Sequence, residues 1–313
     1  MATSIAPPPA QVIILMCTYN GAAFLNAQLD SLAAQTHTDW RLIVSDDGSS
    51  DETLAILNNY QQRWGVTRLE IRHGPRQGFC QNFLSLCCDP TITGSFFAFC
   101  DQDDVWLNDK LTTALTHLQE GDPAVPHLYC GRTIYVHDNL KVCGHSPLFL
   151  FPETFRNALV QSIAGGNTMV FNEATKHLLE VWGPQPVPSH DWWLYLLVSG
   201  VGGEVHYDEH PQVLYRQHPN SLVGGNQSIR ANIKRAWGLL RGRFRQWNSQ
   251  NIAALVRHQS HLSEDNRKIL KLFIRLRTAS LIDRFRLMEV CGLYRQTRMG
   301  TVGLLIAALL NRI

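Results

Sequence analysis

Strand-like apolar runs alternate with helically spaced segments over the first hundred residues, and this alternation restricts the fold more than any other feature. The runs are "QVIILMCTY", "WRLIVSDDGSS", "TRLEIRHG" and "SFFAFC", and the segments between them include "AAFLNAQLDSLAAQ" and "GFCQNFLSLCC". An uninterrupted apolar run suits a strand that is buried on both faces. The chain is therefore predicted to form an α/β fold in which helices cover both faces of a mostly parallel sheet.

Shorter elements follow in the middle of the chain. A helix is predicted in "KLTTALTHLQE", strands in "HLYCGRTIYVHD", "KVCGHSPL" and "GGNTMVFN", a helix in "HDWWLYLLVSG" and a pair of strands in "EVHYDEHPQVLYRQH". Beyond Asn220 the chain is rich in arginine and has helical spacing. The predicted organisation is thus one main domain with a basic helical appendage.

Acidic and polar residues collect where the predicted strands end. They are Cys17, Thr18, Tyr19 and Asn20 after the first strand, Asp46, Asp47 and Gly48 after the second, His73 and Gly74 after the third, and Asp101, Asp103 and Asp104 after the fourth. Ligands of such sheets bind beyond the carboxyl ends of the strands. Three acids within "DQDD" would repel one another unless a cation lies among them. The sequence therefore predicts a site for a divalent cation and, through it, a polyanion.

No glycine-rich phosphate loop follows the first strand. The segment "CTYNGAAF" matches neither G-x-G-x-x-G nor G-x-x-x-x-G-K-[ST]. A nucleotide diphosphate bound here would need a metal instead. Asp101 and Asp103, two apart on an extended segment, can converge with diphosphate oxygens on Mg²⁺ or Mn²⁺.

The net charge of +2 conceals two parts of opposite charge. Up to Gln227 the chain has 11 Lys and Arg against 22 Asp and Glu, and beyond it 17 against 4. A basic tail indicates a polyanionic partner, either nucleic acid or an anionic membrane surface. Nucleic acid is disfavoured, because the acidic body would repel it and the tail has little aromatic interleaving and no zinc or helix-turn-helix pattern.

The cysteines and the start of the chain indicate a cytosolic protein. The eight cysteines form no C-x-x-C pair and no regular framework, so they are predicted to be reduced and buried. Residues 1–10 have neither the basic region nor the apolar core of a secretory signal, and we expect a flexible leader.

Four ordered segments resemble the inverting family 2 glycosyltransferases with the GT-A fold. They are "VIILMCTYNGAAFLNAQLDSLAAQT", "WRLIVSDDGSSDET", "FCDQDDVWLNDKL" and "HDWW". The resemblance covers approximately Gln11 to Gly224 and implies a GT-A domain at 11–225. The basic helical region at 226–313 lies beyond the resemblance and is predicted from its charge and spacing alone. The segments "GGNTMVFN" and "VLYRQHPNSLVG" are similar, more narrowly, to bacterial rhamnosyltransferases of surface polysaccharide assembly.

The resemblance implies where the nucleotide-sugar donor would bind. Cys17, Thr18, Tyr19 and Asp47 would line the base pocket; Tyr19 would stack on the base, and Asp47 would accept from the N3–H of a pyrimidine. Asp103 would hold the metal, and Asp101 would hold the ribose hydroxyls or the metal. Asp104 is the remaining acid of the segment, and the favoured interpretation is that it caps a helix beginning near Leu107.

Three further residues have alternatives. Asn82 is expected either to contact the nucleotide or to stabilise the turn before its helix, and Asn167 either to contact donor or acceptor or to form a turn. His218 is a candidate third contact to the metal or diphosphate.

The transfer requires a base for the acceptor hydroxyl, because an alcohol attacks only as its proton is removed. Asp191 matches the family's base. Trp192 and Trp193 beside it are expected to supply an apolar surround and faces for a sugar. The alternative is that Ser189 or Asp191 merely caps the helix.

The expected donor is a dTDP- or UDP-sugar, and the rhamnosyltransferase resemblance favours dTDP-L-rhamnose over UDP-hexoses and their N-acetyl forms. A nucleotidyltransferase shares the fold type, but it would need a basic, glycine-rich segment after the first strand, which "CTYNGAAF" lacks.

The tail, from about Ile229 to Ile313, is predicted to be a membrane-surface anchor. "IRANIKRAWGLLRGRFRQW" mixes basic and apolar residues at helical spacing, which is typical of helices that lie in the interface. This would place the enzyme on the inner face of the plasma membrane, beside an acceptor carried on a polyprenyl diphosphate. The alternative is that the helices pack on the catalytic domain or form a homodimer.

Overall fold

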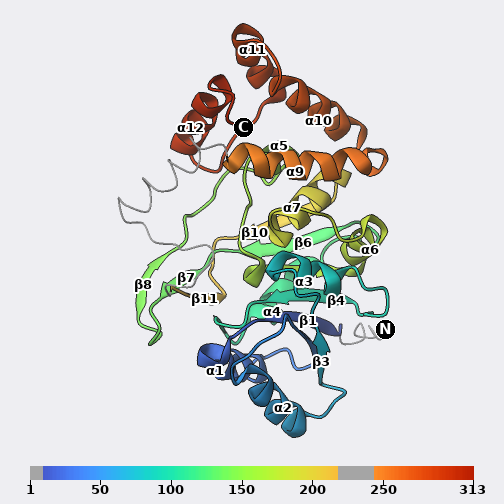
Figure 1. Cartoon of the computed structure of the whole chain (residues 1–313), viewed down its shortest axis with the longest axis vertical. Helices are drawn as coiled ribbons and strands as arrows, with labels where there is room; N and C mark the ends of the chain where they lie inside the picture. Colours follow the sequence, from blue (N-terminus) through green and yellow to red (C-terminus); the bar gives the residue numbers. More distant parts are fainter. Residues whose placement is uncertain (1–9, 218–242) are drawn as a thin grey trace, which may run out of the picture.

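The computed structural model describes residues 10–217 and 243–313 and contains a seven-stranded sheet (Figure 1). Its order is β10-β6-β9-β4-β1-β2-β3. The strands are β1 (Val12–Thr18), β2 (Trp40–Asp46), β3 (Leu69–His73), β4 (Phe96–Cys100), β6 (His127–Gly131), β9 (Val170–Asn172) and β10 (Glu204–Asp208). Only β9 runs antiparallel to its neighbours in this sheet, β4 and β6. The predicted mostly parallel sheet is confirmed.

Helices cover both faces of this sheet, as the unbroken apolar runs predict. They are α1 (Ala22–Ala33), α2 (Thr53–Trp64), α3 (Phe79–Cys87), α4 (Lys110–Leu118), α5 (Phe155–Ala158), α6 (Glu173–Trp182) and α7 (His190–Val201). Within β1, Ile13 and Leu15 pack with α3, α6 and α7, whereas Ile14 and Met16 pack with α1, α2 and α4. Every residue of β1 is buried for this reason.

A second sheet, which the sequence did not predict, closes over the end of β4. Its order is β5-β11-β7-β8, and its strands are β5 (Val105–Trp106), β7 (Ile134–Val136), β8 (Val142–His145) and β11 (Val213–Arg216). The two strands predicted in "EVHYDEHPQVLYRQH" exist as β10 and β11 but belong to different sheets. Since β5 pairs with β11, the segment "DQDD" is held against the end of β11.

The C-terminal helices extend the core rather than standing apart from it. They are α9 (Arg243–Arg257), α10 (Glu264–Leu276), α11 (Leu281–Cys291) and α12 (Arg298–Leu309). Leu255 of α9 and Phe273 of α10 belong to the same hydrophobic cluster as α7. The predicted boundary at residue 225 lies outside the described residues, as do all but the last residue of the predicted leader at 1–10. Over the two described ranges, no helix combines the length and apolar character needed to span a bilayer.

The cysteines agree with the sequence prediction in one respect and differ in another. All eight are free. Two are not fully buried, however: Cys88 is half-buried, and Cys143 is exposed because β8 is the edge strand of the second sheet.

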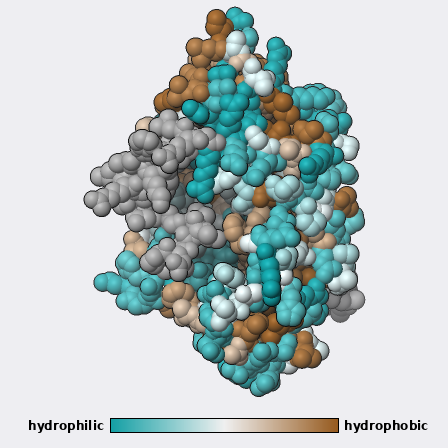
Figure 2. Space-filling view, viewed as in Figure 1, coloured by the Kyte–Doolittle hydropathy of each residue, from teal (hydrophilic) through white to brown (hydrophobic). Residues whose placement is uncertain are grey.

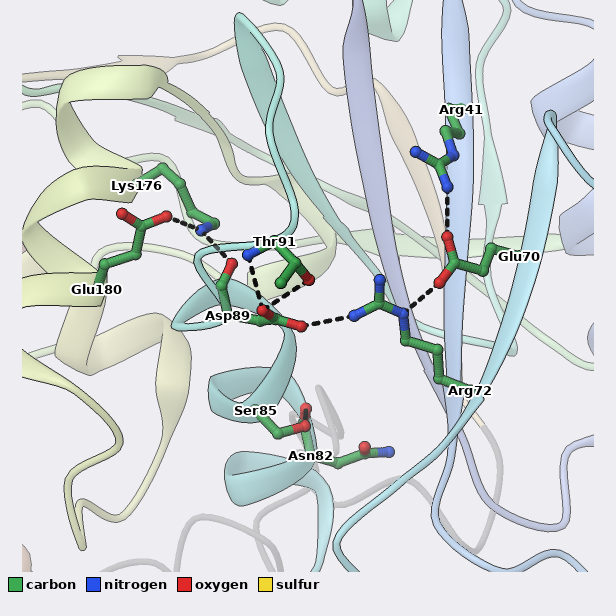
Figure 3. Close-up of polar contacts among 9 residues, drawn as sticks. All are labelled: Arg41, Glu70, Arg72, Asn82, Ser85, Asp89, Thr91, Lys176 and Glu180. Carbon is green, nitrogen blue, oxygen red and sulfur yellow. Dashed lines mark hydrogen bonds and ion pairs between the residues drawn. The ribbon is translucent and has the colours of Figure 1, made fainter.

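Polar contacts connect elements on the α3 and α6 side of the main sheet (Figure 3). Glu70 on β3 accepts from Arg41 and from Arg72 Nε at 2.5 Å, and Arg72 also reaches Asp89 at 2.6 Å. Lys176 on α6 donates to the Asp89 carbonyl at 2.9 Å and pairs with Glu180. The Lys176 side chain is only 2% exposed, so its ammonium depends on these two acceptors.

Glu180→Ala is expected to lower the free energy of unfolding by about 2 to 3 kcal/mol, because it leaves a buried ammonium with a single carbonyl partner. Urea unfolding would measure the loss. A matched control is Glu264→Ala, which breaks an i,i+4 pair with Lys268 on the surface of α10 and should leave the stability nearly unchanged. Equal losses in the two variants would contradict the assigned role of Lys176.

Candidate active site

Four carboxylates from two distant segments of the sequence meet beyond the carboxyl end of β4. Asp101, Asp103 and Asp104 follow that strand, and Asp191 lies in the first turn of α7. Burial, and then the charges of Asp104, Asp103 and Asp191, raise the pKa of Asp101 well above its usual range. The structure therefore brings "DQDD" and "HDWW" together, as the sequence analysis required of one active site.

Asp104 does not cap a helix, which corrects the interpretation favoured from the sequence. Helix α4 begins only at Lys110, and its N-cap residue is Asp109. Asp104 is 1% exposed and accepts hydrogen bonds from the side-chain amide of Asn167 and, at 3.0 Å, from the backbone N–H of Arg216. Burial, together with the charge of Asp103, raises its pKa to about 7. Asp104 thus joins three segments behind the site.

Arg216 is a buried cation beside these acids that the sequence analysis did not single out. Its Nε donates to the Asp103 carbonyl at 2.8 Å, and another guanidinium nitrogen donates to the Asp138 carbonyl. Its guanidinium also lies 4.5 Å from the centre of the Phe24 ring. In the sequence, Arg216 is only an arginine at the end of a predicted strand. Its place beside the acids follows from the pairing of β11 with β5, which the sequence does not reveal.

Asp191 has the environment expected of a general base. Its carboxylate accepts from the Trp192 N–H at 2.6 Å and from the backbone N–H of Gly166. Burial raises its pKa to about 6 in spite of these hydrogen bonds. The N-cap residue of α7 is Ser189, whose side chain makes no capping bond. A carboxylate that titrates near neutral pH suits proton abstraction.

The two tryptophans beside Asp191 do not face a sugar, and that prediction was wrong. Trp193 is completely buried, and its ring lies 5.7 Å from that of Trp182. Trp192 is 6% exposed and donates its indole N–H to the Ala158 carbonyl at 2.7 Å. Both belong to the core because α7 is buried on nearly all sides.

The glycine-rich segment before β9 positions two of the four acids. Gly166 donates to Asp191 and Asn167 donates to Asp104, so one short 3-10 turn, Gly166–Thr168, contacts both. A Cβ at Gly166 would lie 2.5 Å from Nε2 of His190, which leaves no room for another residue. His190 is itself fixed by stacking on Phe83 at 4.0 Å. The expected strand "GGNTMVFN" is therefore half turn and half strand.

Tyr19 and its neighbours form an open surface next to the acids. The Tyr19 side chain is 60% exposed, while its backbone N–H and carbonyl are held by the amide of Gln102 at 2.9 and 3.1 Å. Gln102 therefore connects the loop after β1 to "DQDD", a role that the sequence analysis missed. A Cβ at Gly21 would lie 2.1 Å from the Gln102 side-chain oxygen, which explains the glycine in "CTYNGAAF".

The other predicted base-pocket residues lie along the same edge. Cys17 is buried, and burial followed by the charges of Asp101 and Asp47 raises its pKa well above the usual range. Asp47 accepts backbone N–H groups of Arg76 at 2.5 Å and Gly78 at 2.9 Å. The Thr18 hydroxyl donates to Asp46 at 2.8 Å, so it supports the loop.

Two predicted contacts stay predictions. Asn82 is 1% exposed, and its amide exchanges hydrogen bonds with the hydroxyl and carbonyl of Ser45, which ties α3 to β2. A nucleotide contact at Asn82 would have to add to these bonds. His218 lies outside the described residues.

Asp101 and Asp103 fit a cation that is shared with a diphosphate. In residues 10–217 and 243–313, no three His, Cys, Asp or Glu side chains form a group that could hold a metal ion. Burial is the first cause of the raised pKa of Asp101 and the neighbouring negative charges are the second, and the repulsion among these charges favours a cation between them. Mg²⁺ is commonly bound by one or two carboxylates together with substrate phosphates and water, which matches this set.

Comparison with curated proteins finds bacterial glycosyltransferases. The dTDP-rhamnosyl transferase RfbG of Shigella flexneri is 26% identical over 268 residues, which cover 79% of this chain and 86% of RfbG. The UDP-Glc:alpha-D-GlcNAc-diphosphoundecaprenol beta-1,3-glucosyltransferase WfgD of Escherichia coli is 25% identical over 192 residues, covering 60% of this chain and 69% of WfgD. Some relatives are longer: the chain spans 59% of one from Mycobacterium bovis.

Two solved structures show the same fold at low sequence identity. TarS 1–349 of S. aureus, solved in complex with UDP-GlcNAc, has a TM-score of 0.58 at 16% identity, covering 83% of this chain and 70% of that chain. The mannosyltransferase PcManGT of Pyrobaculum calidifontis, solved with GDP-Man and Mn²⁺, has a TM-score of 0.53 at 18% identity, covering 99% and 89%. The GT-A fold expected from the sequence is confirmed.

The sequence model described as "Glycosyl transferase family 2" matches residues 13–179, which is more than half of the chain. The nucleotidyltransferase and nucleic-acid-binding alternatives are thereby set aside. The protein belongs to glycosyl transferase family 2 and is a glycosyltransferase.

Proposed function

We propose that this glycosyltransferase is metal-dependent and inverting, and that it transfers L-rhamnose from dTDP-L-rhamnose to a hydroxyl of a lipid-linked glycan in bacterial surface polysaccharide synthesis. The observation that carries the proposal is that Asp101 and Asp191 lie close enough for the charge of Asp191 to raise the pKa of Asp101. Asp101 lies beside the open surface at Tyr19, and burial raises the pKa of Asp191 to about 6. The residue proposed to bind the donor, Asp101, would thus lie beside the residue proposed to activate the acceptor, Asp191.

The donor would bind across the ends of β1, β2 and β4. The exposed Tyr19 ring is available to stack on the base. Each oxygen of Asp47 already accepts one backbone N–H but keeps a further lone pair, so the carboxylate can still accept from the N3–H of thymine or uracil. A UDP-hexose or UDP-N-acetylhexosamine is therefore the alternative donor.

Asp101 and Asp103 would hold Mg²⁺ or Mn²⁺. When bound, such an ion neutralises negative charge on the departing diphosphate. Asn167 and Arg216 fix Asp104 behind this pair, and Gln102 holds the loop that carries Tyr19. These contacts keep the donor side in place before the sugar moves.

Asp191 would act as the base of a single displacement. As an acceptor hydroxyl oxygen bonds to the anomeric carbon, its proton passes to the Asp191 carboxylate, and the bond from that carbon to the diphosphate breaks. Nucleoside diphosphate leaves with the electron pair. Attack from the side opposite the leaving group inverts the anomeric configuration.

The names of two relatives support the finer parts of the proposal. RfbG is a dTDP-rhamnosyl transferase, and it aligns over most of both chains. WfgD acts on an acceptor whose name includes diphosphoundecaprenol, which supports a polyprenyl diphosphate carrier for the acceptor of this chain.

The deciding experiment is a donor panel. The purified enzyme with Mn²⁺ and a lipid-linked acceptor is expected to release dTDP from dTDP-L-rhamnose faster than it releases UDP from UDP-glucose, UDP-galactose or UDP-GlcNAc. Preference for a UDP-sugar would overturn the rhamnose assignment and keep the glycosyltransferase. Release of pyrophosphate instead would overturn the chemistry.

The pH dependence follows from Asp191. The base must be deprotonated, and its pKa is raised to about 6, so kcat/KM should be constant above that pH and fall below it. At one pH unit below the pKa, about a tenth of the plateau should remain. The midpoint should not move when Mn²⁺ is increased, whereas a midpoint caused by protonation of metal ligands would move to lower pH.

A further inference from the structure

The outward face of α12 is apolar, although the opposite face already packs on the molecule. Leu304 and Ala308 face inward and are 2% and 1% exposed. The outward side chains are Met299, Val302 and Ile306 of α12 and Leu310, the residue that caps its C-terminus, which are 80%, 51%, 53% and 58% exposed. Their spacing of three or four residues places them in one stripe. A second surface would therefore be needed to cover this face.

The apolar surface continues from α12 onto the loop before α5. Leu148, Leu150 and Phe151 in that loop are 37%, 74% and 38% exposed. The side-chain amide of Gln296, just before α12, exchanges hydrogen bonds with the backbone of Phe151 at 3.0 and 2.9 Å. A cavity of about 440 Å³, lined by Phe151, Pro152, Tyr294, Arg298 and Thr301, opens between the loop and the helix.

We call the seven exposed residues of α12 and this loop the apolar face: Leu148, Leu150, Phe151, Met299, Val302, Ile306 and Leu310. Figure 2 shows apolar residues gathered at the end of the molecule where α11 and α12 lie in Figure 1. Neighbouring α11 also exposes Ile282 and Val290, at 70% and 61%. Monomeric proteins rarely expose so many adjacent apolar side chains without a partner.

The charges around the apolar face favour an anionic partner. Residues 290–313 contain Arg295, Arg298 and Arg312 but no Asp or Glu. Over 243–313 there are 13 Lys and Arg against 4 Asp and Glu. A second copy of this chain, docked face to face, would bring like charges together, whereas an anionic lipid surface would neutralise them.

The dimensions of α12 suit the interface of a bilayer rather than its interior. The helix has 12 residues, and a spanning helix needs about 20. A short helix with an apolar face and flanking arginines lies in the plane of the headgroups. Since α9 and α10 share the catalytic core, docking through α12 would also orient the active site.

We propose that the apolar face docks on an anionic phospholipid bilayer, with Arg298 and Arg312 contacting the lipid headgroups. This inference is independent of the donor sugar. It also restricts the membrane anchor, which was predicted over the whole tail, to α12 and the loop at 148–151. Helices α9 and α10 instead pack on the catalytic domain, which was the alternative considered for the tail.

Flotation of the full chain with vesicles tests the proposal. The protein is expected to float with phosphatidylcholine vesicles that contain phosphatidylglycerol, and much less with pure phosphatidylcholine. Met299→Gln with Ile306→Gln should lower the partition coefficient at least about tenfold, because two exposed apolar anchors are lost. Arg298→Gln with Arg312→Gln should lower it by about fivefold for each arginine on the anionic vesicles only.

A matched control replaces two exposed valines elsewhere. Val66 and Val181 are 68% and 49% exposed. Val66 is the second residue after α2, and in Figure 1 α2 lies at the end of the molecule opposite α12. Val66→Gln with Val181→Gln should float like the wild type. All these side chains are exposed, and equal melting temperatures would confirm that the variants fold. Wild-type protein that does not float, or a Met299/Ile306 variant that floats normally, would overturn the proposal. So would a wild-type dimer that the same variant converts to a monomer without any vesicle binding.

Discussion

Asp191→Asn is expected to reduce turnover by about a thousandfold while the affinity for the nucleotide-sugar changes little. Asparagine has nearly the same shape and keeps an oxygen for the N–H groups of Trp192 and Gly166, but it cannot take up the proton of an acceptor hydroxyl. The loss should therefore appear in kcat rather than in donor binding. Initial rates of dTDP release, with donor titrations by calorimetry, measure the two quantities separately.

A suitable control is Asp208→Asn, which removes a buried carboxylate of the same sheet edge outside the cluster. Asp208 accepts from the Tyr129 hydroxyl at 2.7 Å at the end of β10. Its replacement should lower stability and leave kcat nearly unchanged. The remaining activity of Asp191→Asn should also no longer fall below about pH 6, because the carboxyl group that titrates there is absent. Wild-type turnover in Asp191→Asn would refute the assignment of the base.

The main sheet could be predicted because its signal is local. Each residue of β1 is apolar or small, and the structure shows why: alternate side chains enter two different hydrophobic clusters. The direction of β9 could not be predicted in this way. It has three residues, and its antiparallel course is decided by β4 and β6 on either side, which a local pattern does not encode.

In the candidate site, too, some positions could be predicted from the local sequence and others depend on distant residues. The positions of Asp101 and Asp191 follow from a strand end and a helix start. The role of Asp104 depends on Asn167 and Arg216, which are 63 and 112 residues away. The local sequence indicated only a helix cap near Leu107. In the structure β5 pairs with β11 in this region, and the helix therefore begins later, at Lys110.

For "HDWW" the helix was predicted correctly, but the direction in which its two tryptophan side chains point was not. The helix α7 was predicted, and its sequence is apolar on all sides, which is typical of a buried helix. That signal already argued against two sugar-facing rings. Asp191 and its backbone partners remain at the polar end of the helix, so the catalytic role proposed for this segment rests on the Asp191 carboxylate.

Asp103→Ala is expected to abolish transfer, with a loss of about a thousandfold or more, because the diphosphate would lose one of the two carboxylates that hold its cation. The variant should also lose the effect of Mn²⁺ on nucleotide binding. In the wild type, calorimetry at a low Mn²⁺ concentration should show tighter dTDP binding than in EDTA, and in Asp103→Ala the two affinities should be alike at that same low concentration. This second measurement does not depend on turnover, so it tests the metal assignment directly.

Asp109→Ala provides the matched control, since Asp109 lies in the same connection between β4 and α4 and its side chain makes no capping bond. It should keep both turnover and the response to Mn²⁺. Because Asp101 remains in the Asp103 variant, high Mn²⁺ should restore a small part of the activity, whereas loss of the fold could not be restored in this way. Full wild-type activity in excess EDTA would contradict metal dependence. The repulsion among Asp101, Asp103, Asp104 and Asp191 would then have to be relieved without a metal ion, in part by protons, and activity should rise rather than fall as the pH is lowered toward the pKa of Asp104, about 7.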